Sequence, residues 1–135
     1  MCLTKLLPLP KRLPKTGYKV FKGIHSEDLN PSVLLSVFCN GVYKHGVWYK
    51  DVVEETIVAL ELEYPTGYHI FLTRQPAERY CEWWGGWPYM VRKVKFRNTV
   101  AYGEQKFTLI QHSHARTFHI KCVVAREMFI LREED

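Results

Sequence analysis

The sequence contains no complete catalytic, metal-binding or nucleotide-binding motif along its 135 residues. Its cysteines are few and widely spaced, and no two lie within four residues of each other, which excludes the CxxC motifs of zinc and redox sites. They are Cys2, Cys39, Cys81 and Cys122. We therefore predict free thiols in a reducing compartment, with no bound metal and no cofactor.

Long apolar runs are also absent. No stretch approaches the ~20 apolar residues that a membrane-spanning helix needs, so we predict no membrane association. Near the start of the chain, Pro8 and Pro10 interrupt a short group of leucines, which is too short to be the core of a signal peptide. These absences favour a cytoplasmic protein.

The composition is that of an ordinary globular protein with an excess of positive charge. Hydrophobic residues make up 47% of the chain and aromatic residues 14%, which is enough for a packed core. A chain of this length is the size of one domain and buries about two-thirds of its unfolded surface. The net charge of +5 favours association with phosphates or with acidic proteins, so nucleic acid or an acidic protein is the predicted partner.

The first residues differ in composition from the rest. They combine Pro8, Pro10 and Pro14 with several basic residues, and proline removes backbone donors and fixes φ. We predict a proline-rich basic N-terminal arm over residues 1–16, which is either a disordered tail or a contact for phosphate or a protein partner. Residues 17–135 are predicted to form a single domain.

Strand patterns dominate the predicted domain. Apolar and β-branched stretches bounded by turn signals predict a series of short strands. They cover residues 18–22, 33–38, 42–43, 47–49, 68–72, 90–97, 107–110, 118–124 and 128–131. Asn40-Gly41 is typical of a tight hairpin, and Tyr102-Gly103-Glu104 is predicted to be a turn.

Two segments have helical patterns. Asp51 can cap a helix that runs to about Leu62, with an apolar stripe on one side, although the β-branched residues of this segment disfavour a helix. Thr73 can cap a second helix that ends near Trp84. Its predicted buried stripe is Ala77, Tyr80, Cys81 and Trp84. The predicted fold class is α+β, a single domain with a mainly antiparallel sheet and two helices.

Basic and aromatic residues predict one binding surface. Lys93, Lys95 and Arg97 alternate with apolar residues, so they share one face of the predicted strand. Trp83 and Trp87 come shortly before this strand, and indoles beside cations can stack bases and hold phosphates. In the alternative interpretation, the indoles cap the core and the cations form an ordinary solvated face.

Histidines provide two further candidates. For His69, which lies in a predicted strand, the alternatives are a buried, hydrogen-bonded side chain and a catalytic acid–base. His112, His114 and His119 with Cys122 form the densest group of potential metal ligands. Their spacing matches no zinc site, and His119 and Cys122 point to opposite faces of a strand, so we predict surface histidines.

Segments from four parts of the chain carry a family resemblance. They are residues 18–23 (YKVFKG), 43–49 (YKHGVWY), 67–71 (GYHIF) and 125–130 (AREMFI). In this layout the chain resembles small uncharacterised phage and prophage proteins. The resemblance implies a viral or mobile-element origin, the host cytoplasm and no known activity.

A second resemblance is to the ADP-ribosyltransferase fold. It depends on an early strand that carries a cation beside a tyrosine, and on the later segment at residues 67–71. It implies Tyr18, Lys19, His69 and Glu104 as the groups around a nicotinamide dinucleotide. The sequence departs from that family in having no early Arg or His on the first strand, no Ser-Thr-Ser element and no ExE pair.

Two functional hypotheses follow, and the sequence does not decide whether the protein is an enzyme. The first is a small basic phage-type accessory protein, a binding module for nucleic acid or an acidic host protein. Its candidate binding residues are Trp83, Trp87, Lys93, Lys95, Arg97, Tyr18 and His69. The alternative is a diverged ADP-ribosyltransferase-like enzyme or another protein that binds NAD or a nucleotide.

Overall fold

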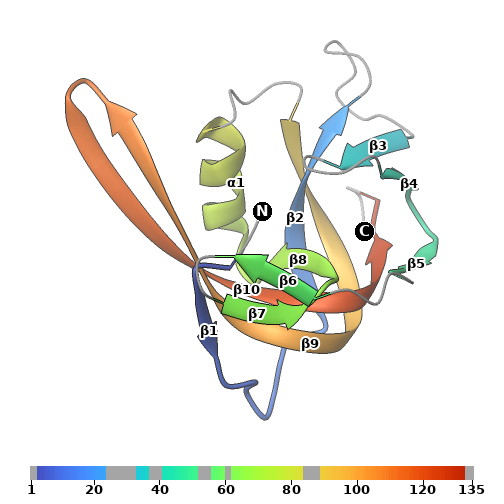
Figure 1. Ribbon diagram of the computed structural model, residues 1–135. Coiled ribbons are helices and arrows are strands. Elements are labelled where there is room, and N and C mark those ends of the chain that lie inside the picture. Colours follow the sequence, from blue (N-terminus) through green and yellow to red (C-terminus); the bar gives the residue numbers. More distant parts are fainter. Residues whose placement is uncertain are drawn as a thin grey trace.

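The computed structural model describes residues 3–23, 33–36, 41–51, 56–59, 62–83 and 89–132, and a mainly antiparallel sheet dominates it (Figure 1). The short strands are β1 (Lys5–Leu7), β2 (Thr16–Gly23), β3 (Val33–Ser36), β4 (Val42–Lys44), β5 (Trp48–Lys50), β6 (Thr56–Ala59), β7 (Leu62–Pro65) and β8 (Tyr68–Phe71). Helix α1 (Arg74–Trp83), the one helix of the described residues, follows them. Two long strands, β9 (Tyr89–Gln111) and β10 (His114–Ile130), come last. The predicted antiparallel sheet is confirmed.

Strands β9 and β10 organise the sheet because each is long enough to pair with several partners. The strand order is β1-β9-β10-β8-β2-β3-β4, and β5 also pairs with β10. The first part of β9 also pairs with β2, while β8 pairs with both β10 and β2, so the pairings close a ring of β2, β9, β10 and β8. The register between β9 and β10 shifts at Val124/Ala125, and such a bulge bends the strands.

Apolar side chains pack on both faces of this curved sheet. One core contains Phe71 and Val124 and is covered by Tyr80 of α1. The other core contains Ile70 and Val123. Because successive residues of a strand point to opposite faces, neighbours such as Ile70 and Phe71 belong to different cores. This alternation determines which polar residues share a surface.

Helix α1 confirms the second predicted helix. It begins at Arg74, directly after Thr73, and its buried residues Ala77, Tyr80 and Cys81 follow the predicted stripe. The predicted end of the helix at residues 84–86 lies outside the described residues. Within the described ranges, no helix is long and apolar enough to cross a membrane.

The other predicted helix, from Asp51 to about Leu62, is wrong. Strands β6 and β7 form an antiparallel pair there, with Ile57 opposite Tyr64. The β-branched run Thr56-Ile57-Val58 loses side-chain freedom in a helix and fits a pleated strand better. The fold therefore has one helix in its described part rather than two. Residues 52–55, 60 and 61 lie outside that part.

The predicted turn at Tyr102-Gly103-Glu104 is also wrong, because these residues lie within β9. Gly103 pairs with Leu6 of β1 on one side and with Cys122 of β10 on the other. A Cβ atom at Gly103 would overlap the carbonyl oxygen of Lys5. The glycine therefore allows β1 to approach closely instead of forming a turn. The strands predicted on either side of it merge into β9, and those at 118–124 and 128–131 merge into β10 up to Ile130.

Part of the predicted N-terminal arm belongs to the sheet. Lys5–Leu7 forms β1, and the side chain of Leu3 is fully buried in the core beneath α1. The backbone N–H of Thr4 donates to the carbonyl oxygen of Glu104 at 2.8 Å. Leu9, between the prolines, is 51% exposed. The segment thus starts with an anchored strand and continues as an exposed connection to β2.

The turn between β9 and β10 consists of His112 and Ser113, with φ angles of 48° and 69°. Positive φ at both central residues is the geometry of a type I′ turn, which favours Asn-Gly. We expect the double substitution H112N/S113G to stabilise this hairpin by about 1 kcal/mol, because it relieves left-handed backbone strain. Slower amide hydrogen exchange at Gln111 and His114 would measure the gain. The control H112A/S113A keeps the strain, so equal protection in both variants would contradict the prediction.

Candidate functional site

The most basic exposed part of the sheet lies where β9, β10 and β5 run side by side. Lys95 of β9 pairs with Phe129 of β10, which in turn pairs with Trp48 of β5. In the next row, Arg97 pairs with Glu127, and Glu127 pairs with Lys50. Residues two apart on a strand share a face, so these rows form one surface together with Lys93. We call Trp48, Lys50, Lys93, Lys95, Arg97 and Phe129 the basic face.

Cations and aromatic rings are in contact on the basic face. The guanidinium carbon of Arg97 lies 3.9 Å from the centroid of the Trp48 ring, and Nζ of Lys95 lies 5.4 Å from that of Phe129. The Trp48 and Phe129 rings are 5.5 Å apart. Arg97 thus holds the Trp48 ring from one side, and the indole is still 38% exposed. Cation–π contacts of this kind fix the direction of both groups.

Glu127 is the carboxylate that lies among these cations. Nη2 of Arg97 donates to Oε1 of Glu127 at 3.2 Å, and the amide of Asn98 donates to the other carboxylate oxygen. Lys93 and Lys95 make no ion pair with any residue of the described ranges. The basic face therefore carries more positive charge than its own carboxylate neutralises, and it attracts anions.

The sequence predicted Lys93, Lys95 and Arg97 of the basic face, but not Lys50 or the aromatic residues. Trp83 is on α1, where its ring packs against Tyr80 and Phe107, at 5.5 Å and 6.0 Å between centroids. Trp87 lies outside the described residues. The indole that contacts Arg97 is Trp48, which was predicted only as part of a strand. Finding it from the sequence requires the β5–β10 pairing, which no local pattern contains.

Tyr18 extends the basic face toward α1. It pairs with Lys93 across the β2–β9 ladder, and its ring lies under the guanidinium group of Arg74, at 5.3 Å. Arg74 also makes an exposed ion pair with Glu78, at 3.7 Å. The structure thus brings Tyr18, Lys93, Lys95 and Arg97 onto one surface, whereas His69 lies in the interior and Trp83 beside other partners.

His69 is a buried, hydrogen-bonded histidine, only 7% exposed. Its Nε2 is 3.1 Å from the hydroxyl oxygen of Tyr64, which accepts a bond from the backbone N–H of Leu3 at 2.9 Å. Nζ of Lys19 donates to the carbonyl oxygen of His69 at 3.0 Å. Burial first, and then the charge of Lys19, lower the pKa of His69 to about 3. The imidazole is therefore neutral at physiological pH.

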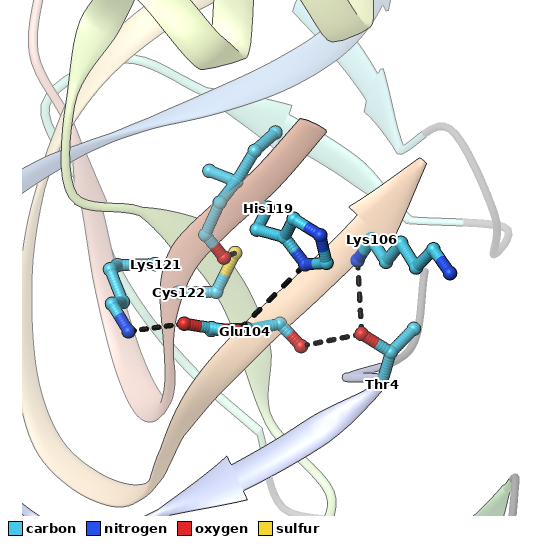
Figure 2. Close-up of polar contacts among 7 residues, drawn as sticks. Thr4, Glu104, Lys106, His119, Lys121 and Cys122 are labelled. Atoms are coloured by element: carbon cyan, nitrogen blue, oxygen red, sulfur yellow. Dashed lines mark hydrogen bonds and ion pairs between the residues drawn. The ribbon is translucent and has the colours of Figure 1, made fainter. Parts of the chain in front are cut away.

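Glu104 does not share a site with His69 and Tyr18. Figure 2 shows its carboxylate accepting a bond from Nζ of Lys121, while Nδ1 of His119 lies 3.9 Å away. The bond with Lys121, followed by the charges around it, lowers the pKa of Glu104. Residue alternation places Glu104 and Lys121 on the face opposite to His69. The four groups that the ADP-ribosyltransferase resemblance implies are thus not brought together.

The histidines near the β9–β10 turn lie apart from Cys122, the fourth residue of that group of potential metal ligands. His112 is in the turn, His114 begins β10, and His119 is exposed beside Glu104. Cys122 is fully buried in the core, and burial raises the pKa of its thiol. In the residues that the structure describes, no group of three or more His, Cys, Asp or Glu side chains could hold a metal ion.

Comparisons with protein-family models, with curated proteins and with solved structures found no match for this chain. The functional interpretation therefore depends on the surfaces of the molecule itself. Of these, the basic face is the one that gathers predicted site residues into a single exposed patch.

Proposed function

We propose that this protein is a nucleic-acid-binding module and that the basic face is its contact surface. The supporting observation is the gathering of four cations around Trp48 and Phe129, with Glu127 as the carboxylate among them. Lysine and arginine bind phosphates, and exposed aromatic rings stack with bases. A phage origin is a further part of the proposal, and it is supported by the sequence resemblance alone.

The excess of positive charge adds to this proposal. The chain has 19 Lys and Arg residues against 14 Asp and Glu residues, a net charge of +5. A polyanion gains several contacts at once on the basic face, and each contact releases counterions.

Aromatic residues on the basic face favour nucleic acid over an acidic protein. The carboxylates of an acidic protein would contact only the cations. A nucleic-acid base would also stack on an aromatic ring, which contributes about 1–3 kcal/mol per stacked base. Trp48 is 38% exposed while its ring contacts Arg97, so part of this residue is available to stack with a base. Phe129 supports the indole from within the same face.

The triple substitution K93Q/K95Q/R97Q tests the proposal. We expect it to weaken binding to a labelled single-stranded oligonucleotide at least about tenfold in low salt, because it removes cations that neutralise phosphates. It should also lower the slope of log affinity against log salt by roughly 2 to 3. Fluorescence anisotropy over a range of salt concentrations measures both quantities.

A matched control has the same loss of charge elsewhere. The variant K11Q/R12Q/K15Q changes three exposed cations of the N-terminal segment and should retain most of the affinity. The variant W48A keeps every charge and should lose affinity without changing the salt slope. Equal losses in both triple variants would show that binding follows net charge alone, and the absence of binding in low salt would remove the proposed function.

A further inference from the structure

The far ends of β9 and β10 form a hairpin that extends away from the rest of the protein (Figure 1). Its base is the stacked pair Phe107 and Phe118, with centroids 5.1 Å apart, and Phe107 packs against Tyr80 of α1. Beyond this pair, the hydroxyls of Thr108 and Thr117 are 3.1 Å apart on the exposed surface. We call residues 108–117 the hairpin arm.

The end of the hairpin arm is exposed to solvent. Ile110 is 77% exposed, and residues 112–117 are all exposed, so these side chains cover no core. Two-stranded hairpins are only marginally stable in water when no other element packs against them. The exposed side chains and strand edges of such a hairpin are available to a partner.

The charges at the base of the arm favour an anionic partner. Residues 105–120 contain no Asp or Glu but carry Lys106, Arg116 and three histidines. At the base, Arg116 and Arg79 of α1 both place their guanidinium groups over the ring of Phe118, at 5.2 Å and 5.7 Å. The cations are thus concentrated where the arm leaves the body, and smaller polar side chains occupy its tip.

We propose that the hairpin arm enters the major groove of duplex DNA, with Arg79 and Arg116 on the flanking phosphates. The major groove, roughly 12 Å wide and 8.5 Å deep, accepts a two-stranded ribbon, whereas the minor groove of about 6 Å does not. Each strand of the arm extends about 13 Å past the Phe pair, which is enough to reach base edges. The deep, narrow major groove of duplex RNA excludes such a ribbon.

Side chains on the arm fit this groove. On one face, Thr108 and Thr117 present hydroxyls, and Ile110 lies beside Ala115 in the ladder. Hydroxyls can bond to base edges, and small apolar groups contact the thymine methyl group. This inference rests on the proposed function, because it names the form of nucleic acid. It uses residues at the opposite end of the β9–β10 ladder from the basic face, so the two can be tested separately.

A shortened arm provides the test. Replacing residues 110–115 with Asn-Gly makes Leu109 and Arg116 the pair that closes the turn. This pair has the same hydrogen-bonding type in the antiparallel ladder as Gln111 and His114, which close the turn in the native protein. The change keeps the formal charge, the Phe pair and both arginines. We expect the full chain with this change to bind a duplex of about two helical turns at least about tenfold more weakly, with unchanged affinity for single strands.

Three further measurements test whether the effect is specific to the arm. Methylation of guanine N7, which lies in the major groove, should be blocked by the native protein and restored by the shortened arm. The variant H112N/S113G keeps the arm length and changes only the turn, so it should lose less duplex affinity than the shortened arm, which separates the effect of length from that of the turn residues. A thermal melt that matches the native protein confirms that the shortened variant folds.

The outcomes distinguish this inference from the proposed function. If K93Q/K95Q/R97Q weakens binding but the shortened arm does not, the role of the arm is overturned and the basic face stands. An equal loss on duplex DNA, duplex RNA and polyglutamate would also overturn it, because the arm would then be a general polyanion contact. If the native protein binds none of these in low salt, both proposals fall together.

Discussion

Replacing Gly103 with valine is expected to lower the free energy of unfolding by about 3 kcal/mol and to release β1 from β9. A side chain at this position overlaps the carbonyl oxygen of Lys5 and approaches Cδ1 of Leu3 at 3.3 Å. Backbone cannot give way as a flexible side chain can, so β1 must move. The fully buried Leu3 then loses its packing, which is typically worth about 1.5–3 kcal/mol, along with the hydrogen bond from Thr4.

A double-mutant cycle with Leu3→Ala isolates the cause. Leu3→Ala alone is expected to cost about 2–5 kcal/mol, as for other buried leucines. If G103V acts by displacing β1, it costs much less in the L3A background, because the packing of Leu3 is already lost. Chemical denaturation gives the free energies, and amide exchange at Leu6 reports whether β1 is released. Additive effects with a protected Leu6 amide would contradict this explanation.

Local patterns predicted the parts of the fold that local physics determines. Helix α1 follows from the spacing of Ala77, Tyr80 and Cys81, because a stripe of this period has to face a core. The alternation of Lys93, Lys95 and Arg97 with buried residues likewise follows from the two-residue period of a strand. Both features depend on residues close together in the sequence.

The segments that were predicted wrongly are those whose structure depends on pairing between strands. The segment from Asp51 to Leu62 has helical spacing, but pairing of Ile57 with Tyr64 and a β-branched run favour strands. Gly103 resembles a turn residue, yet its role is defined by β1, about a hundred residues earlier in the chain. No window along the sequence contains both partners of such a contact.

The candidate site likewise contains residues that a local pattern predicts and residues that only strand pairing brings together. Three of its cations, Lys93, Lys95 and Arg97, share one strand and were predicted together. Phe129 reaches them through the pairing of β9 with β10, and Trp48 and Lys50 through the pairing of β5 with β10. Proximity in sequence made Trp83 the expected neighbour, but it lies over Phe107 instead. The buried Arg92 within the same strand, 3% exposed, was not predicted either, since alternating charge is usually solvated.

Acid is expected to destabilise this protein through His69. Its folded pKa of about 3 lies below the value of about 6.5 for an unfolded chain, so below pH 6.5 the unfolded state binds a proton that the folded state does not. The contribution to stability is therefore present above pH 6.5 and is lost as pH falls toward 3. At pH 4.5, this one group lowers the free energy of unfolding by about 2 to 3 kcal/mol relative to neutral pH.

The substitution His69→Gln separates this effect from other titrating groups. Glutamine can still bond to the hydroxyl of Tyr64 but cannot take up a proton. The difference in unfolding free energy between native protein and H69Q should thus change by about 2 to 3 kcal/mol between pH 7.5 and pH 4.5. Parallel stability curves for native protein and H69Q would contradict the prediction, because they would mean that His69 takes up its proton with the same pKa in the folded and unfolded states.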